Sequence, residues 1–160
     1  MVFAAAWLCS FAAHGFDGVA LELGYGEDST RLLRVAVQDR WRKEFRRGDG
    51  WRLAGYWDFA VGVWDNTDAS TADIGITPVF RLDRERVYLE AAIGAHLVQR
   101  RISADRVFSS AFQFGDHIGI GVRGRAYDLG LALQHLSNGG IRRPNPGINF
   151  ILLRLQYHLQ

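Results

Sequence analysis

The sequence has little cysteine and proline, a single lysine and no long hydrophobic run. Its one cysteine, Cys9, excludes an intramolecular disulfide framework and a cysteine-rich zinc site. No apolar run reaches the roughly 18 residues that a membrane-spanning helix needs. This excludes a polytopic helical membrane protein. The net charge of +2 is too small to indicate a nucleic-acid-binding protein.

Glycine, arginine and apolar residues are plentiful instead. There are 18 glycines against 3 prolines, a balance that favours strands and turns over helices. Lys43 is the only lysine, so arginine supplies nearly all of the positive charge. Hydrophobic residues make up 48% and charged residues 22%, so a disordered chain is not expected. The length of 160 residues fits a single domain, with or without a segment removed on export.

The N-terminal residues resemble an export signal. A short apolar run at residues 2–13 is followed by His14 and Gly15, as in the apolar core and cleavage zone of a secretory signal peptide. We therefore predict a signal peptide over residues 1–15, lacking the usual basic first segment, and a mature domain over residues 16–160. The alternative is a buried N-terminal helix. Cys9 lies inside the apolar run without the small residues that precede a lipoprotein cysteine, so lipidation is not expected.

Apolar residues occupy every second position in eight stretches of the remaining chain. This period of two predicts β-strands with one apolar face each. Eight strands of about ten residues use roughly half of the chain. The stretches are residues 19–25, 33–37, 51–63, 74–80, 87–97, 112–122, 129–133 and 151–159.

Polar and small residues fill the alternate positions, for example Glu90, His117 and Arg154. A soluble barrel turns its aliphatic rows inward, whereas a membrane barrel turns them toward lipid and keeps a polar interior. The alternation is the same in both cases. Several stretches have the length of a tilted membrane strand, and tryptophan and tyrosine lie mostly near their ends, as in interfacial girdles. With the export signal, these features predict an all-β, eight-stranded antiparallel transmembrane β-barrel of the bacterial outer membrane.

The barrel prediction fixes which connections share a side of the membrane. Both termini are expected in the periplasm, together with the basic stretch 39–50, which we interpret as a solvated turn. Because side chains can fill the interior of an eight-stranded barrel, a transport channel is not expected. The connections predicted to lie outside the cell are residues 27–30, 66–70, 99–107 and 138–146.

One apolar row ends in polar residues. The row of Leu129, Leu131 and Leu133 continues into His135 and Ser137, and polar side chains facing hydrocarbon are costly unless they have partners. Residues two apart on a strand project from the same face, so the imidazole can act as a general base and the hydroxyl as a nucleophile. The alternative is that both residues simply lie at the headgroup level.

The segment that begins at Gln134, QHLSNGGIRRPNPGIN, resembles the active-site strand and loop of the outer-membrane lipid A 3-O-deacylases, the PagL family. The family pattern is His-x-Ser-Asn, then a glycine, then Pro-Asn-x-Gly-Ile before an acidic residue. The segments 52–64, 78–80, 87–95 and 115–122 resemble the family in order and spacing. The residues that match the pattern are His135, Ser137, Asn138, Gly140, Pro144, Asn145, Gly147 and Ile148.

The resemblance implies a role for each matching polar residue. Ser137 would attack the ester carbonyl, and His135 would take its proton. Asn145 and the backbone N–H near Gly140 would be oxyanion donors, and Asn138 would order the loop. Turn formation alone is the alternative for the two loop asparagines. No cofactor is expected, and no metal is expected either, because no cluster of carboxylates or histidines converges near Ser137 in this register.

The chain departs from the family at the acid. Asn149 stands where the family usually has a glutamate that orients the histidine, and pairing across the loop places it opposite His135. Asparagine can hold an imidazole tautomer, but it cannot supply a charge. Asp116 is the candidate for another acid, since its register is expected to place it diagonal to His135. Its alternative role is an interfacial or turn contact.

The leading hypothesis is an esterase that removes the ester-linked 3-hydroxyacyl chain at the 3-position of lipid A, at a site facing the outer leaflet. Lipid A or lipopolysaccharide is then the substrate. Whether the protein forms a homodimer is left open. Arg142 and Arg143 would contact phosphate or core acid groups, or would be solvated loop charges. One alternative is a non-catalytic structural or adhesive outer-membrane barrel. The other is a soluble eight-stranded barrel that carries a lipid inside.

Overall fold

The computed structural model describes residues 15–67, 69–99 and 107–159. The predicted signal peptide lies outside these residues, apart from Gly15, so it stays a prediction. The described chain is almost entirely β-structure, with one short 3₁₀ helix, η2 (Glu27–Ser29). No helix in this part of the chain is long and apolar enough to cross a bilayer.

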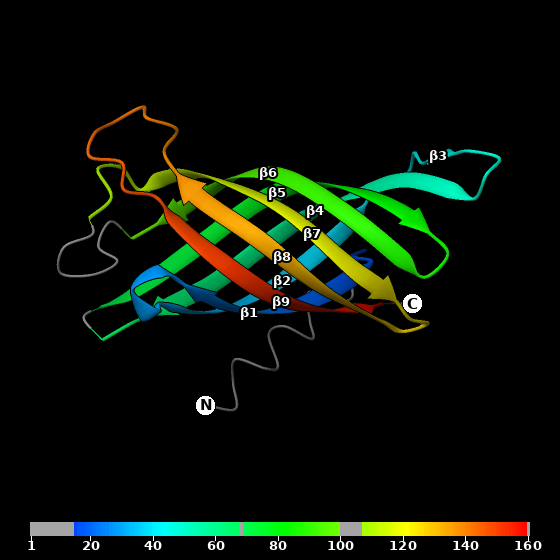
Figure 1. Cartoon of the computed structure of the whole chain (residues 1–160), viewed down its shortest axis with the longest axis horizontal. Coiled ribbons are helices and arrows are strands. Elements are labelled where there is room, and N and C mark those ends of the chain that lie inside the picture. Colours follow the sequence, from blue (N-terminus) through cyan, green and yellow to red (C-terminus); the bar gives the residue numbers. More distant parts are fainter. Residues whose placement is uncertain (1–14, 68, 100–106, 160) are drawn as a thin grey trace.

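Eight antiparallel strands close into a barrel (Figure 1). Neighbouring strands pair in the order β2-β1-β9-β8-β7-β6-β5-β4, and pairing of β2 with β4 closes the sheet. Each of the eight predicted stretches lies on one of these strands, except that the last stretch extends one residue beyond β9, so the predicted fold class is confirmed. The barrel strands are β1 (Gly18–Gly26), β2 (Arg31–Arg40), β4 (Trp51–Asp65), β5 (Ser70–Arg84), β6 (Val87–Val98), β7 (Phe112–Arg123), β8 (Tyr127–Ser137) and β9 (Ile148–His158).

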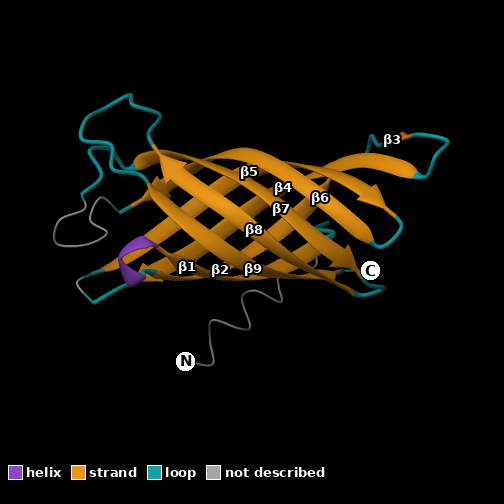
Figure 2. Ribbon diagram, in the orientation of Figure 1, coloured by secondary structure: helices purple, strands orange, loops and turns teal. Residues whose placement is uncertain are grey.

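The two ends of the barrel differ (Figure 2). The end that we call the loop end gathers η2, the connection after β4, the described parts of the connection after β6, and the connection 138–147. The opposite end, which we call the turn end, carries two tight turns, the C-terminus and the stretch 41–50. That stretch holds the two-residue strand β3 (Phe45–Arg46), which pairs with the extended end of β4. The predicted grouping of the connections is therefore confirmed for the described residues.

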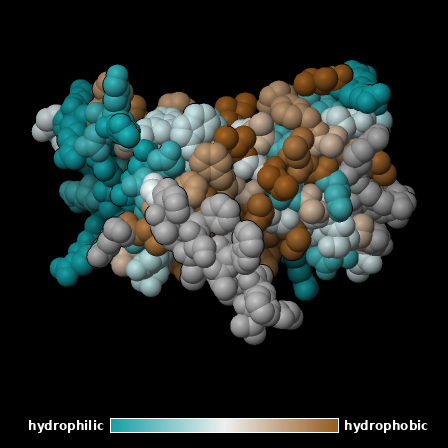
Figure 3. Space-filling model, turned by 180° about the vertical axis from the view of Figure 1, so that it is seen from behind, coloured by the Kyte–Doolittle hydropathy of each residue, from teal (hydrophilic) through white to brown (hydrophobic). Residues whose placement is uncertain are grey.

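The outer wall of the barrel is apolar. On β8, Leu129, Leu131 and Leu133 are 48% to 57% exposed, whereas the alternate residues Ala132 and Gln134 are buried. The same alternation runs around the wall, and Figure 3 shows apolar side chains across it, with hydrophilic residues gathered toward the turn end. A soluble barrel would show the opposite arrangement. The structure therefore confirms a transmembrane barrel and excludes the lipid-carrying soluble barrel.

Ion pairs fill the middle of the interior. Arg34 donates to Glu22 at 2.9 Å and to Asp73 at 2.7 Å, and Arg154 pairs with Glu22 and Asp58. All five side chains are at most 5% exposed. Buried charges are stable only when they are paired and hydrogen-bonded, which explains why the charges come in this matched layer. The layer occupies the interior at this level and links β1, β2, β4, β5 and β9.

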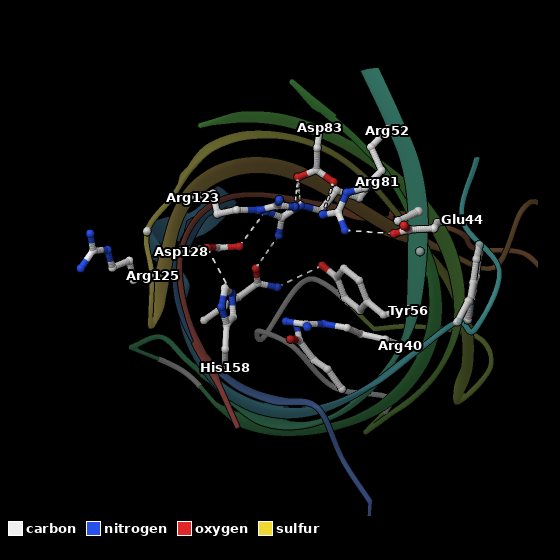
Figure 4. Close-up of a pocket in the computed structure, with 16 residues that line it drawn as sticks. Arg40, Glu44, Arg52, Tyr56, Arg81, Asp83, Arg123, Arg125, Asp128 and His158 are labelled. Atoms are coloured by element: carbon white, nitrogen blue, oxygen red, sulfur yellow. Dashed lines mark hydrogen bonds and ion pairs between the residues drawn. The ribbon is translucent and has the colours of Figure 1, made fainter. Parts of the chain in front are cut away.

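A second charged cluster lies at the turn end, around a cavity of about 270 Å³ (Figure 4). Asp83 accepts hydrogen bonds from Arg52 and Arg81, each at 3.0 Å, and from Arg123. Arg81 also pairs with Asp128 at 2.6 Å. One carboxylate therefore joins guanidinium groups from β4, β5 and β7, and it ties these strands together where the barrel opens.

Replacement of Asp83 by alanine should destabilise the barrel by about 3 kcal/mol, because it leaves partly buried guanidinium groups without their shared acceptor. The measurement is the free energy of unfolding in urea from lipid vesicles. Asp49→Ala is the control, since the contacts of Asp49 on the exposed turn are long: 3.5 Å to Arg47 and 3.5 Å from the N–H of Trp51. We expect a change below about 0.5 kcal/mol there. Equal values for the two variants would contradict the proposed role of Asp83.

Candidate active site

The site begins where the outward row of β8 reaches the loop end. Alternation along β8 turns His135 and Ser137 outward, and both are half-buried. Leu136, between them, points inward and is fully buried in an apolar cluster. In that cluster Trp64 packs edge-on against Phe150 at a ring-centroid distance of 5.2 Å. The buried alternate residue holds the backbone of this segment, so the two polar side chains share the lipid-facing wall as predicted.

His135 is hydrogen-bonded across the strand pair β8–β9. The register pairs His135 with Asn149, as the sequence predicted. Nδ1 of the imidazole lies 2.8 Å from Oδ1 of Asn149. Because an amide oxygen only accepts, the proton of this bond belongs to Nδ1. Nε2 then has no hydrogen bond within the described part of the chain and is left as a proton acceptor.

Asn149 also contacts a carboxylate that the sequence did not single out. Nδ2 of Asn149 donates to Oε1 of Glu27 at 2.5 Å. Glu27 belongs to η2 in the β1–β2 connection, and it reaches β9 because β1 is the other neighbour of that strand. No motif marks Glu27 in the sequence. Only the pairing of Gly26 with Phe150 places it next to Asn149.

The predicted position of Asp116 requires a correction. Asp116 lies directly opposite His135 in the β7–β8 register, not diagonal to it. The tight turn between the strands starts the ladder at Arg123 and Asp128, and the register that follows brings residues 116 and 135 face to face. Asp116 is exposed on the outer wall. The described hydrogen bond of the imidazole nevertheless goes to Asn149.

A glycine lies beside the imidazole. Gly147 has a φ of +61°, in the left-handed region that favours glycine. A Cβ atom at this position would lie 2.9 Å from Cε1 of His135 and 3.4 Å from Nε2. Residue 147 must therefore be small for the histidine ring to keep its present position.

Asn138 organises the loop after Ser137. Its side chain donates to Oγ of Ser109 at 3.0 Å and to the carbonyl oxygen of Arg142 at 2.8 Å. Its Oδ1 accepts from the N–H of Gly140 at 2.9 Å, and its own N–H donates to Oδ1 of Asn145 at 3.0 Å. With an exposure of 1%, Asn138 is the internal cross-link of this loop. Ser109 is a second residue that the sequence did not single out.

The groups expected to donate to the oxyanion, Asn145 and the N–H near Gly140, are engaged differently than predicted. The N–H of Gly140 is engaged by Asn138. The N–H of Gly139 donates to Oγ of Ser137 at 3.4 Å, so it is the backbone donor next to the hydroxyl. Asn145 uses its oxygen toward Asn138 and keeps its Nδ2 without a partner among the described residues. Roles for Asn145 and Gly140 stay predictions.

A groove of about 750 Å³ runs along the outer wall beside the row. Its polar end contains His135, Asn149 and Glu27, and its other end is aliphatic. Arg142 and Arg143 lie exposed in the loop above Ser137. Among residues 15–67, 69–99 and 107–159, no group of three histidine, cysteine or acidic side chains is placed to hold a metal ion. The aliphatic residues of the groove are Ile118, Leu133 and Ile151.

Fold and site together define an eight-stranded outer-membrane-type β-barrel with a serine–histidine pair on its lipid-facing wall. A sequence profile described as Lipid A 3-O-deacylase (PagL) matches residues 32–158. The chain belongs to this family.

Individual relatives agree with the family assignment. The lipid A deacylase PagL of Bordetella bronchiseptica is 36% identical, over 88% of this chain and 82% of that protein. The lipid A deacylase PagL of Pseudomonas aeruginosa is 28% identical, over 81% of this chain and 79% of that protein. The crystal structure of the outer membrane enzyme PagL superimposes with a TM-score of 0.81 at 27% identity, over 89% of this chain and 99% of that one. The chain is accordingly an integral β-barrel of the bacterial outer membrane.

Proposed function

We propose that the protein is an esterase that removes the ester-linked 3-hydroxyacyl chain at the 3-position of lipid A. Its family and its two deacylase relatives support this substrate. The position of the site supports it as well, because His135 and Ser137 lie on the outer wall at the loop end. A lipid in the outer leaflet can reach them while its acyl chains stay in hydrocarbon.

The reaction proceeds in two steps on Ser137. Its Oγ attacks the ester carbonyl carbon while Nε2 of His135 takes the hydroxyl proton. The tetrahedral intermediate then collapses, the C–O bond to lipid A breaks, and the imidazolium returns its proton to the leaving 3-hydroxyl group. In the second step His135 activates a water molecule, which hydrolyses the acyl-enzyme and releases the 3-hydroxy fatty acid.

Three groups are the candidate donors to the developing negative charge. The N–H of Gly139 donates to Oγ of Ser137, and Nδ2 of Asn145 has no hydrogen bond among the described residues. The N–H of Gly140 is the third candidate, and in this structure it donates to Oδ1 of Asn138. Preorganised donors stabilise an oxyanion more than they stabilise the ground-state carbonyl.

Other loop residues would bind and position the substrate. Arg142 and Arg143 are exposed above Ser137, where guanidinium groups can pair with phosphate or core acid groups. Asn149 holds the histidine tautomer in place of the usual glutamate. Asp116 remains the alternative acid, since it faces the same outer wall opposite His135. All these groups come from one chain, so the proposed reaction does not need the homodimer that the sequence left open.

The single observation that carries the proposal is the bond from Nδ1 of His135 to Asn149, which leaves Nε2 as a base on the row that Ser137 shares. The test uses the purified protein in detergent with lipopolysaccharide and measures the released 3-hydroxy fatty acid. We expect release in the presence of a chelator. The absence of any release would favour the non-catalytic barrel, and release that needs calcium would contradict the serine–histidine mechanism.

Gly147→Ala should lower the kcat of this reaction about a hundredfold, because an added Cβ displaces the ring of His135 and misplacement of about 1 Å has effects of this size. The measurement is the rate of fatty acid release at saturating substrate. Gly50→Ala is the matched control. Gly50 also has a positive φ, of +87°, but nothing lies within 4 Å of its added Cβ and it belongs to the turn end. Equal rates in the two variants would contradict the close approach of residue 147 to the histidine.

A further inference from the structure

The inference concerns the carboxylate of Glu27, which is linked to His135 through Asn149. It accepts a hydrogen bond of 2.5 Å from Nδ2 of Asn149, whose Oδ1 lies 2.8 Å from Nδ1 of His135. The three side chains form a continuous line along the outer wall, from η2 through β9 to β8. The proposal that follows rests on the proposed esterase function.

The backbone delivers Glu27 to this position. Gly26 pairs with Phe150 on β9, so the residue after Gly26 lies beside Asn149. The turn is closed by hydrogen bonds from the N–H of Gly26 to the carbonyl of Thr30, at 2.8 Å, and from the N–H of Thr30 to the carbonyl of Glu27, at 3.1 Å. Thr30 is fully buried. The carboxylate is thus carried by a short, anchored turn and not by the tip of a long loop.

The carboxylate at the end of this line determines which atoms donate and which accept its hydrogen bonds. An asparagine side chain has an oxygen and a nitrogen of nearly the same shape, and it can present either one to a histidine. An ionised carboxylate only accepts. Glu27 therefore selects the orientation in which the Asn149 nitrogen faces the carboxylate and the oxygen faces His135. That orientation requires the proton on Nδ1 and leaves Nε2 free.

We propose that Glu27 is a positioning residue of the reaction, whose carboxylate fixes the amide of Asn149 and, through it, the tautomer of His135 that can act as a base. The chain thereby separates two tasks that one glutamate performs in the usual arrangement. Asn149 contacts the histidine, and Glu27 supplies the acceptor and the negative charge. The charge also favours the imidazolium that forms when Ser137 loses its proton.

The kinetic test is a double-mutant cycle in the full-length protein, with lipopolysaccharide as substrate. Glu27→Ala should lower kcat between about tenfold and a hundredfold with little change in KM, well below the ~10⁴ loss for a triad histidine held in the wrong tautomer, because the contact is exposed and screened. In the Asn149→Glu background, a carboxylate contacts His135 directly and needs no orientation. There, Glu27→Ala should cause no loss of kcat.

A spectroscopic test does not depend on turnover. In protein labelled with ¹⁵N at histidine, the ring signals of His135 report which nitrogen carries the proton, and His135→Gln identifies them among the five histidines. We expect the Nδ1–H tautomer in the wild type and an increased share of Nε2–H in Glu27→Ala. If the wild type released no fatty acid, the proposed function would fail, and the tautomer comparison would still decide the role of Glu27.

Asp28→Asn is the control, because Asp28 is the adjacent acidic residue of the same turn. It has a φ of 55°, which asparagine also tolerates. This variant should keep the wild-type kcat and tautomer, which separates the effect of Glu27 from that of general negative charge at the rim. An unchanged tautomer in Glu27→Ala, or an equal loss of kcat in both backgrounds, overturns the proposal.

Discussion

Ser137→Ala should reduce release of the 3-hydroxy fatty acid by at least about a thousandfold, since loss of a nucleophile leaves only the contribution of binding and of the oxyanion donors. Ser137 is the only serine or threonine on the outward row of β8 that carries His135, and the other hydroxyl of that row, on Tyr127, lies at the opposite end of the strand. The expected result is a variant without measurable turnover that still binds lipopolysaccharide.

The same variant should keep its fold. Ser137 is half-buried at the end of β8, and among the described residues its Oγ accepts one long hydrogen bond, of 3.4 Å. Its loss should change the free energy of unfolding by less than about 1 kcal/mol. An unaltered β-sheet spectrum and heat-modifiable gel mobility check this. Wild-type turnover in a folded Ser137→Ala protein would contradict the assignment of the nucleophile.

Asn149→Ala should lower kcat about a hundredfold, less than the loss of ~3 × 10⁴ for a triad aspartate, because a neutral amide orients the histidine without adding charge. The truncation removes both the 2.8 Å hydrogen bond to Nδ1 of His135 and the hydrogen bond to Glu27. The measurement is the rate of fatty acid release at saturating substrate. A rate equal to that of the wild type, with a large loss in Asp116→Ala, would move the orienting role to Asp116 on β7.

Asn149→Glu should act in the opposite direction. A carboxylate next to the imidazole favours the imidazolium formed during attack, and the full effect of general acid–base catalysis is about a hundredfold or more. Glu27 reduces the gain, because Asn149→Glu brings two carboxylates into contact and like charges oppose ionisation of both. We therefore expect a rise of a few-fold, and a larger rise when Glu27→Gln is added.

The fold could be predicted because successive residues of a strand in a membrane barrel face lipid and the interior in turn, and each environment requires a different kind of side chain. The outward row Leu129, Leu131 and Leu133 and the inward residues Glu90, His117 and Arg154 are both visible in the sequence. Alternation alone could not say which row faces inward. Strand length and the placement of aromatic residues near strand ends made that choice, and the exposed leucines of β8 confirm it.

The local part of the site was also predictable. His135 and Ser137 are two residues apart on one strand, and a single loop joins their strand to Asn149, so register follows from loop length. The β7–β8 register was predicted less well, and Asp116 is directly opposite His135 instead of diagonal.

Glu27 could not be predicted from any motif, because its contact with Asn149 joins residues 122 positions apart. It depends on closure of the barrel, which brings β1 next to β9. The sequence placed Glu27 in an outer loop and gave no reason to associate it with the histidine. The loop contacts of Ser109 were hidden in the same way, since they span 29 and 33 residues. Site residues supplied by distant strands become visible only when the register of the whole barrel is known.

The most direct test of the proposed function is mass spectrometry of lipid A from Gram-negative cells that produce either the wild-type protein or Ser137→Ala at equal levels in the outer membrane. The wild type should yield lipid A that has lost one ester-linked 3-hydroxyacyl chain, from the 3-position, whereas cells with Ser137→Ala should keep the unmodified lipid A. Unmodified lipid A in both strains, or loss of the same chain in both, would contradict deacylation by Ser137.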